Sequence, residues 1–265
     1  MRPNSYGALA LVADIESLAL AELAAREAGQ FLAAGPRRHA VLVHETAHDV
    51  KLQADRDAED RIVDVLTAGS SIPIIAEERA GDTAPQSAGG LSWIVDPLDG
   101  TFNYLRGIPF CCVSVALWKD DQPVVGVVYD FDRDEMFSSI VGEGAWVNGV
   151  PLRVRNVPPD RAVLCTGFPA ATDFAPEALA RLVTQIATFR KVRLIGSAAL
   201  SLAYVAAGRA DAYFERDIRV WDVAAGLALV RAAGGEFLSS VSPIDHGLNV
   251  YAHNGSCPWP GPSFV

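Results

Sequence analysis

The chain has 265 residues, half of them hydrophobic and a fifth charged, with a formal net charge of −10. This balance excludes a disordered or fibrous chain and predicts a soluble globular enzyme with a large core. The acidic excess argues against nucleic acid or an anionic membrane as partner, because both need a positive surface. No apolar run reaches membrane-spanning length and no signal peptide is evident, so we expect a cytoplasmic protein without a membrane partner.

In the first half, apolar residues at helical spacing predict helices over residues 8–34 and 55–66. A short apolar strand is expected over 72–76, and a polar, glycine-rich loop over 82–90. Further strands are expected over 91–96, 111–118, 123–130 and 135–140. Asn148-Gly149 then predicts a tight hairpin turn.

The second half alternates strands with helices. The expected strands cover 163–166, 192–195 and 212–215, and the expected helices cover 176–189, 198–207 and 222–233. Strands early and alternation later predict a layered α+β fold. Because no linker would release an independent unit, we expect one domain over 1–265, with subdomains at approximately 1–155 and 156–265.

The most informative segment is the end of the strand near residue 95. It reads Asp96-Pro97-Leu98-Asp99-Gly100-Thr101, which joins an apolar strand to two carboxylates and a tight turn. A core strand rarely ends in two unpaired carboxylates, because burying them without partners is costly. Their oxygens suit hard divalent cations, and Thr101 can cap the following helix. The alternative is an ordinary Asx turn followed by a helix cap.

Two other acidic segments share this setting. Alone, Glu77-Glu78 is typical of a solvated loop start, and Asp222 is typical of a helix cap. Each nevertheless stands where an apolar strand or aromatic residue gives way to a turn or helix start. Two divalent ions bridged by such carboxylates activate water and neutralise a phosphoryl group. The cysteines and histidines, in contrast, lack the spacing of a zinc site.

Together these segments resemble the three signature motifs of the inositol monophosphatase family, whose members are Mg²⁺-dependent, lithium-sensitive phosphatases. The motifs are Glu77-Glu78, the hexapeptide from Asp96 to Thr101, and Trp221-Asp222. Supporting matches run from about residue 45 to 236, in the family's order and relative spacing. The resemblance implies a layered α-β-α-β-α sandwich of the inositol monophosphatase and fructose-1,6-bisphosphatase type, and a homodimer.

The resemblance also implies roles for individual residues. The metal ligands for two or three Mg²⁺ ions, with Mn²⁺ as a substitute, would be Glu77, Asp96, Asp99, Asp222 and the Leu98 carbonyl, with Asp55 at a weaker third site. The catalytic residues would be Glu77, Thr101 and Asp99, with Glu77 and Thr101 orienting the attacking water and Glu78 behind them. The substrate contacts would be Leu98, Asp99, Gly100, Thr101 and Asp222 on the phosphate side, and Gly196, Ser197, Ala198 and Glu215 on the alcohol side.

One region departs from the family pattern. Where relatives commonly have Asp-x-Val-Thr, this chain reads Asp49-Val50-Lys51-Leu52, so the threonine hydroxyl is missing. The lysine usually found a little upstream is also absent. The third metal position is therefore the least supported part of the expected site.

The expected activity is a Mg²⁺-dependent phosphomonoesterase acting on a small polyol or sugar phosphate, with inositol 1-phosphate as the first candidate. Direct attack by a metal-activated water is expected, because no Cys, His or Ser near the carboxylates has the setting of an activated nucleophile. The alternatives are fructose-1,6-bisphosphatase or another sugar or nucleotide phosphatase of the superfamily. A non-catalytic metal- or ligand-binding regulator is more distant, because the expected metal carboxylates are intact.

Overall fold

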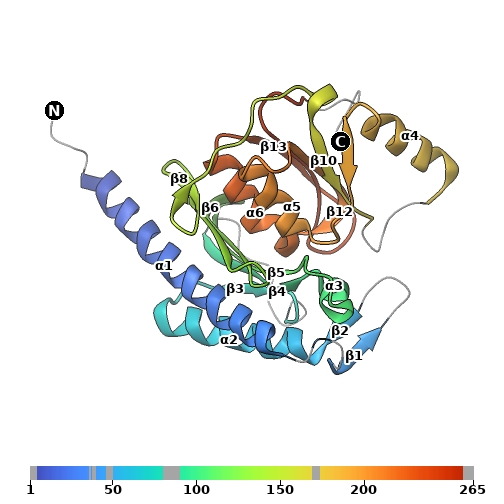
Figure 1. Ribbon diagram of the computed structural model, residues 1–265. Helices are drawn as coiled ribbons and strands as arrows, with labels where there is room; N and C mark the ends of the chain where they lie inside the picture. The colour runs from blue at the N-terminus through green and yellow to red at the C-terminus, as the bar shows by residue number, and fades with distance from the viewer. Residues whose placement is uncertain are drawn as a thin grey trace.

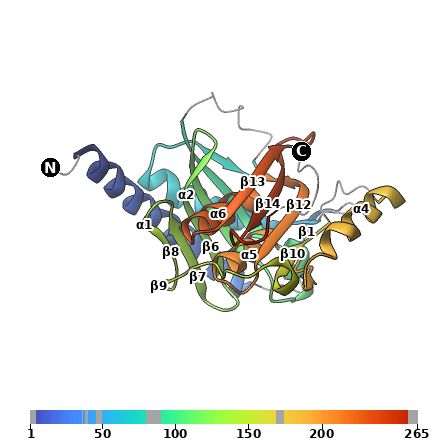
Figure 2. The same cartoon turned by 90° about the horizontal axis from the view of Figure 1, so that it is seen from above.

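The computed structural model describes residues 5–35, 37, 40–45, 50–79, 90–168 and 174–258, without the side chains of 5–13, 45 and 50. Figure 1 shows layers of helix and sheet stacked in the order helix, sheet, helix, sheet, helix. The fold is the α-β-α-β-α sandwich expected from the sequence. Figure 2 looks down on the upper sheet, with the N-terminal end of the first helix projecting at one side.

The helices are α1 (Ser5–Ala34), α2 (Gln53–Gly69), α3 (Thr101–Arg106), α4 (Pro176–Ile186), α5 (Ala198–Ala206) and α6 (Val220–Ala232). The first sheet has the order β3-β4-β5-β6-β7-β8-β9, with β3 (Ile74–Ala76), β4 (Leu91–Asp99), β5 (Cys112–Lys119), β6 (Gln122–Asp130), β7 (Glu135–Ile140), β8 (Gly144–Val147) and β9 (Val150–Pro151). The second has the order β11-β10-β12-β14-β13, with β10 (Val163–Thr166), β11 (Lys191–Arg193), β12 (Ala212–Arg219), β13 (Glu236–Val241) and β14 (Gly247–His253). A small hairpin pairs β1 (Leu42–Glu45) with β2 (Val50–Leu52).

Strand β4 is buried on both faces, and its alternating side chains serve two cores. Trp93 and Val95 join the core under α1 and α2. Ile94 joins the core that α5 and α6 fill between the two sheets. Because side chains alternate, Asp96 follows Ile94 onto the inner face, toward α6.

Helices α5 and α6 pack closely against one another between the sheets. A Cβ atom on Gly226 of α6 would lie 2.4 Å from the Leu202 Cβ of α5, so only glycine fits at this crossing. Two side chains of β5 hold α6 in place: Ser114 Oγ donates to the Trp221 carbonyl at 3.3 Å, and Trp118 Nε1 donates to the Ala224 carbonyl at 3.2 Å. The start of α6 is thereby fixed above the end of β4.

Most of the expected elements are present, with their ends shifted by a few residues. The turn at Asn148-Gly149 is confirmed: these two residues link β8 to β9, with φ values of 48° and 78°. Strands β13 and β14 have no counterpart among the expected elements. Most of the expected loop 82–90 lies outside the described residues. The first sheet ends at Pro151 and the second begins at Val163, but the subdomain division near residue 155 stays a prediction.

Candidate metal centre

Three carboxylates from separate elements meet at the end of β4. In the parallel pair β3–β4, Ala76 lies opposite Val95, so the next residues, Glu77 and Asp96, are level with one another. Asp222 reaches them from the first turn of α6. One oxygen from each of these three carboxylates lies within 4.8 Å of the others. Mg²⁺ binds oxygens at about 2.1 Å, so it joins ligands up to about 4 Å apart, and only a small inward movement of these oxygens would let them share such an ion.

The electrostatics of this group favour a cation. Burial and the nearby Glu78 and Asp55 raise the pKa of Glu77 to about 8, against the lowering effect of Lys51. Burial, followed by Glu77 and Asp99, raises the pKa values of Asp96 and Asp222 well above their usual range. Without a counter-charge these carboxyl groups therefore keep their protons to higher pH than free carboxyl groups do. Hard oxygen donors under mutual repulsion are the donor set that divalent cations prefer, so these residues fit the metal that the motifs imply.

The turn after Asp96 has the Asx form that was the alternative interpretation. Asp96 Oδ1 accepts a hydrogen bond from the Leu98 amide at 2.9 Å. Gly100 has φ 89°, and a Cβ there would lie 2.7 Å from the Phe110 carbonyl oxygen. Both facts require glycine. The expectation that Thr101 caps α3 was wrong: Gly100 is the N-cap, and Thr101 is the first helical residue.

The Thr101 hydroxyl points back to the turn and to α2. Its oxygen lies 3.0 Å from the Leu98 carbonyl oxygen and 3.2 Å from Asp55 Oδ1, so its proton can go to either. Asp55 Oδ2 also accepts a hydrogen bond from the Leu52 amide at 2.5 Å. Burial raises the pKa of Asp55 to about 7. Asp55 thus stands behind Thr101 as a hydrogen-bonded partner, an arrangement that the sequence did not indicate.

Asp99 lies beside the three clustered carboxylates and is held by the start of α5. Its Oδ2 accepts hydrogen bonds from Ser197 Oγ at 2.5 Å and from the Ala199 amide at 2.8 Å. Burial raises its pKa to about 6 against the lowering effect of these bonds. The structure brings Asp99 together with Ser197 and Ala198, as the family pattern implies. The metal-binding roles of Asp99 and the Leu98 carbonyl stay predictions.

Asn103 is a positioning residue that the sequence did not single out. Its Nδ2 donates to the Phe110 carbonyl at 2.8 Å and to the Ile195 carbonyl at 2.9 Å. It thereby ties α3 to the turn at Gly196, which has φ 77° and leads into α5. The sequence could have indicated this residue only through its position, two residues after the end of the Asp96–Thr101 segment.

Glu215 reaches the site region from the second sheet. It is buried on β12, and burial together with Asp99 raises its pKa to about 8. It lines a cavity of about 190 Å³ with Thr166, Gly167 and Arg216. A Cβ on Gly167 would lie 2.4 Å from Glu215 Oε1, so the glycine makes room for the carboxyl group. Glu215 is therefore placed for a ligand that extends away from the clustered carboxylates.

In the sequence, Lys51 is part of the segment that departs from the family pattern. In the structure it lies beside the clustered carboxylates. Its Nζ donates to Glu78 Oε1 at 2.6 Å and lies 3.8 Å from Glu77 Oε1. The Glu78 amide in turn donates to Glu59 Oε2 at 2.8 Å. Glu78 thus stands behind Glu77, with a lysine for its partner.

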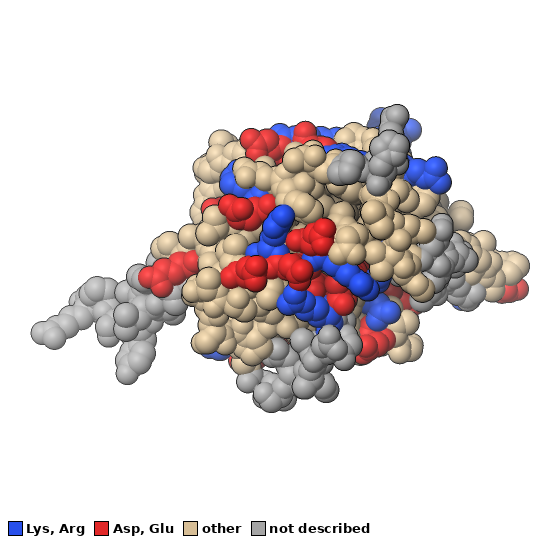
Figure 3. All heavy atoms as spheres, turned by 90° about the horizontal axis from the view of Figure 1, so that it is seen from below, with Lys and Arg blue, Asp and Glu red and all other residues tan. Residues whose placement is uncertain are grey.

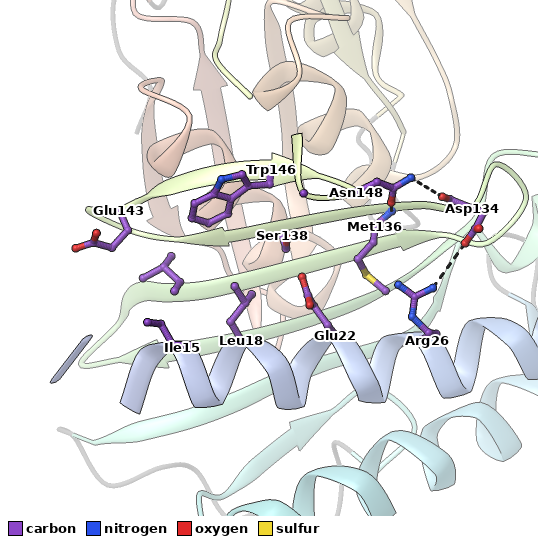
Figure 4. Close-up of a pocket in the computed structure, with 12 residues that line it drawn as sticks. Ile15, Leu18, Glu22, Arg26, Asp134, Met136, Ser138, Glu143, Trp146 and Asn148 are labelled. Atoms are coloured by element: carbon purple, nitrogen blue, oxygen red, sulfur yellow. Dashed lines mark hydrogen bonds and ion pairs between the residues drawn. The ribbon is translucent and has the colours of Figure 1, made fainter. Parts of the chain in front are cut away.

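A larger hollow lies elsewhere, between α1 and strands β7 and β8. Figure 4 shows Ile15, Leu18 and Glu22 of α1 facing Met136 and Trp146, with an ion pair between Arg26 and Asp134 at its edge. Its volume is about 830 Å³. No residue expected at the metal site lines it. The larger hollow and the clustered carboxylates are therefore separate features of the molecule.

Comparison with known proteins agrees with this geometry. The pattern of the "Inositol monophosphatase family" matches residues 14–246. The chain belongs to the inositol monophosphatase family. It is 42% identical over 212 residues to the inositol-1-monophosphatase of Mesorhizobium japonicum, covering 78% of this chain and 77% of that relative. It is 40% identical over 223 residues to a "Nus factor SuhB" of Pasteurella multocida, covering 82% and 83%.

Solved structures of the family share the fold. The inositol monophosphatase from Anabaena (Nostoc) superposes with a TM-score of 0.76 at 34% identity, covering 90% of both chains. The Thermotoga maritima enzyme gives a TM-score of 0.75 at 29% identity, covering 91% of this chain and 92% of that one. The family pattern and the shared fold therefore both identify the inositol monophosphatase family.

Proposed function

We propose that this chain is a Mg²⁺-dependent phosphomonoesterase that hydrolyses a small polyol or sugar phosphate, with inositol 1-phosphate as the first substrate. The convergence of Glu77, Asp96 and Asp222 within 4.8 Å of one another carries the proposal. Their oxygens, with Asp99 and the Leu98 carbonyl beside them, would hold two Mg²⁺ ions, and Mn²⁺ as a substitute. Divalent ions bound there lower the pKa of water and neutralise a phosphoryl group.

The residues around Thr101 are suited to handle the proton of the attacking water. The Thr101 hydroxyl can donate to Asp55 at 3.2 Å and at the same time accept a hydrogen bond from water. Asp55, whose pKa is raised to about 7, can accept a proton near neutral pH. Glu77, together with Thr101, would orient the same water. Burial raises the pKa of the neighbouring Cys112 thiol, which keeps it protonated and argues against a covalent phosphoenzyme.

The two sides of the substrate would meet different parts of the chain. Leu98, Asp99, Gly100, Thr101 and Asp222 would surround the phosphate, with the Gly100 and Thr101 amides directed at its oxygens. Gly196, Ser197, Ala198 and Glu215 would line the alcohol side. The cavity beside Glu215, about 190 Å³, is below the roughly 300–1,000 Å³ of sites for drug-sized ligands, which supports a small alcohol.

We also propose that the partner is this small molecule, and that neither a nucleic acid nor a membrane is bound. The net charge is −10, and Figure 3 shows acidic side chains among the basic ones on the described part of the face that carries α1 and α2. Among the described residues, no helix is long and apolar enough to cross a membrane. A homodimer is proposed on the family pattern. The name "Nus factor" is the name of a relative, and we do not extend it to this chain.

The test is phosphate release from a panel of phosphomonoesters, with and without Mg²⁺ and with added lithium. Mg²⁺-dependent, lithium-inhibited hydrolysis of inositol 1-phosphate is expected. Preferred turnover of fructose 1,6-bisphosphate or a nucleotide would replace the substrate and keep the mechanism. No release from any member, with RNA binding at physiological salt, would overturn the proposal in favour of a non-catalytic binding role.

A further inference from the structure

Lys51 brings a fixed positive charge to one side of the carboxylate cluster. It lies on β2, only 26% of its side chain is exposed, and its Nζ contacts Glu78 at 2.6 Å. The same nitrogen lies 3.8 Å from Glu77 Oε1, and Glu77 is one of the three clustered carboxylates. The lysine is therefore a direct neighbour of the proposed metal ligands.

The carboxylate expected to bind a third ion is already held by protein donors. Asp55 Oδ2 accepts from the Leu52 amide at 2.5 Å, and Asp55 Oδ1 lies 3.2 Å from the Thr101 hydroxyl. Leu52 itself is fully buried in the core under α1 and α2. At the position where relatives commonly have threonine, the chain thus offers an apolar side chain and no hydroxyl ligand.

The remaining acidic groups on this side are also paired with the protein. Glu59 Oε2 accepts from the Glu78 amide at 2.8 Å, and Glu59 Oε1 lies 3.2 Å from Arg79 Nε. Glu78 is held by Lys51 and faces Arg56 at 3.7 Å. An additional divalent ion would have to displace these donors and approach the lysine ammonium against its charge.

We propose that the Lys51 ammonium replaces the third divalent ion, so that the centre binds two ions where the family pattern implies up to three. This inference rests on the proposed metal-dependent function and concerns only the number of ions. The tethered charge would screen Glu77 from Glu78 and Asp55 without a dissolved cation. Even at a saturating metal concentration, no third ion would then bind beside Asp55.

The number of bound ions can be counted without turnover. Free Mn²⁺ is measured by electron paramagnetic resonance while the protein is titrated with Mn²⁺ alone, and circular dichroism verifies folding of each variant. Wild type is expected to bind two ions. Lys51→Met should bind a third, more weakly held ion, and Lys51→Met/Asp55→Asn should lose it again. Lys51→Arg, which keeps the charge, should bind two.

Arg56→Met is the matched control, because it removes a cation that faces Glu78 at 3.7 Å, whereas Lys51 also lies beside Glu77. Arg56 is 52% exposed, so this variant should keep two ions, with dissociation constants changed by less than about fivefold. Three ions in wild type, or two in a folded Lys51→Met, would overturn this inference and leave the proposed function standing. No ion bound by wild type would overturn the proposed metal-dependent function together with this inference.

Discussion

Strands β4 and β12 belong to different sheets and carry their carboxylates in different surroundings, although Asp99 of β4 and Glu215 of β12 interact electrostatically. At the end of β4, Asp96 is crowded by Glu77, Asp99 and Asp222, each of which raises its pKa beyond the effect of burial. In the middle of β12, burial and then the charge of Asp99 raise the pKa of Glu215 to about 8, and Asp222 also interacts with this carboxyl group. The end of β4 concentrates negative charge, whereas β12 places the buried Glu215 in a cavity that the part-exposed Asp217 also lines.

This difference suggests a division of labour. A group of mutually repelling carboxylates is stabilised by divalent cations, which serve the phosphate. A single buried carboxyl group in a cavity can exchange hydrogen bonds with alcohol hydroxyls. We therefore expect changes on β4 to act on the chemical step, and changes on β12 to act on substrate affinity.

The largest expected effect comes from Asp96→Asn on β4. Loss of one ligand charge should lower kcat by about 10³-fold, the upper range for removing one electrostatic contact to a transition state. The metal-free variant should melt about 2–4 °C higher, the shift that about 1 kcal/mol gives in a domain of roughly this size, because repulsion is relieved. Steady-state kinetics and calorimetry in EDTA measure the two effects.

Asp130→Asn is a matched control for a buried aspartate away from the site. Asp130 is fully buried and pairs with Arg133 at 2.9 Å, so its neutralisation should lower the melting temperature and leave kcat nearly unchanged. If Asp96→Asn kept full activity, or if both variants lost activity equally, the division between the two strands would fail.

Glu215→Gln on β12 should have a smaller and different effect. Loss of a hydrogen-bond partner should raise KM for inositol 1-phosphate about tenfold, the upper range for one hydrogen bond, while kcat changes less. Asp217→Asn, a part-exposed residue lining the same cavity, provides the control and should leave KM nearly unchanged. A loss confined to kcat would instead place Glu215 in the chemical step.

Local patterns predicted most of the elements and the position of each carboxylate motif along the chain. Helical spacing predicted α1 and α2, and the apolar run before Asp96 predicted β4, because these signals depend on neighbouring residues. The meeting of Glu77 with Asp96 depends on the parallel register of β3 and β4, which neither strand reveals alone. It was expected because the three acidic segments share a setting at the ends of apolar segments, and because together they resemble the motifs of one family.

The features that were missed depend on packing between distant segments. β13 reads Glu-Phe-Leu-Ser-Ser-Val, with most of its side chains exposed, so it lacks the apolar run that predicted β4. Lys51 lies on a strand of three residues, which is too short for a periodic signal. Its place in the site depends on its contact with Glu78, which is distant in the sequence. Asn103 likewise acts through two carbonyl groups, that of the nearby Phe110 and that of the remote Ile195.

The smallest expected effect is a pH dependence of stability, which tests the repulsion between the carboxylates near β4. Glu77, Asp96, Asp99 and Asp222 have pKa values raised in the folded, metal-free protein, so the folded state binds more protons than the unfolded state. Their stabilising effect is therefore complete below about pH 4, the usual carboxyl pKa, and is lost as the pH rises toward about 8.

The melting temperature in EDTA should fall over this range, and Mg²⁺ should reverse the fall by replacing the protons. Asp96→Asn should flatten the EDTA profile, whereas Glu215→Gln should flatten it less because fewer charges surround that residue. Equal slopes in wild type and Asp96→Asn would show that the repulsion on β4 does not govern the acidic centre.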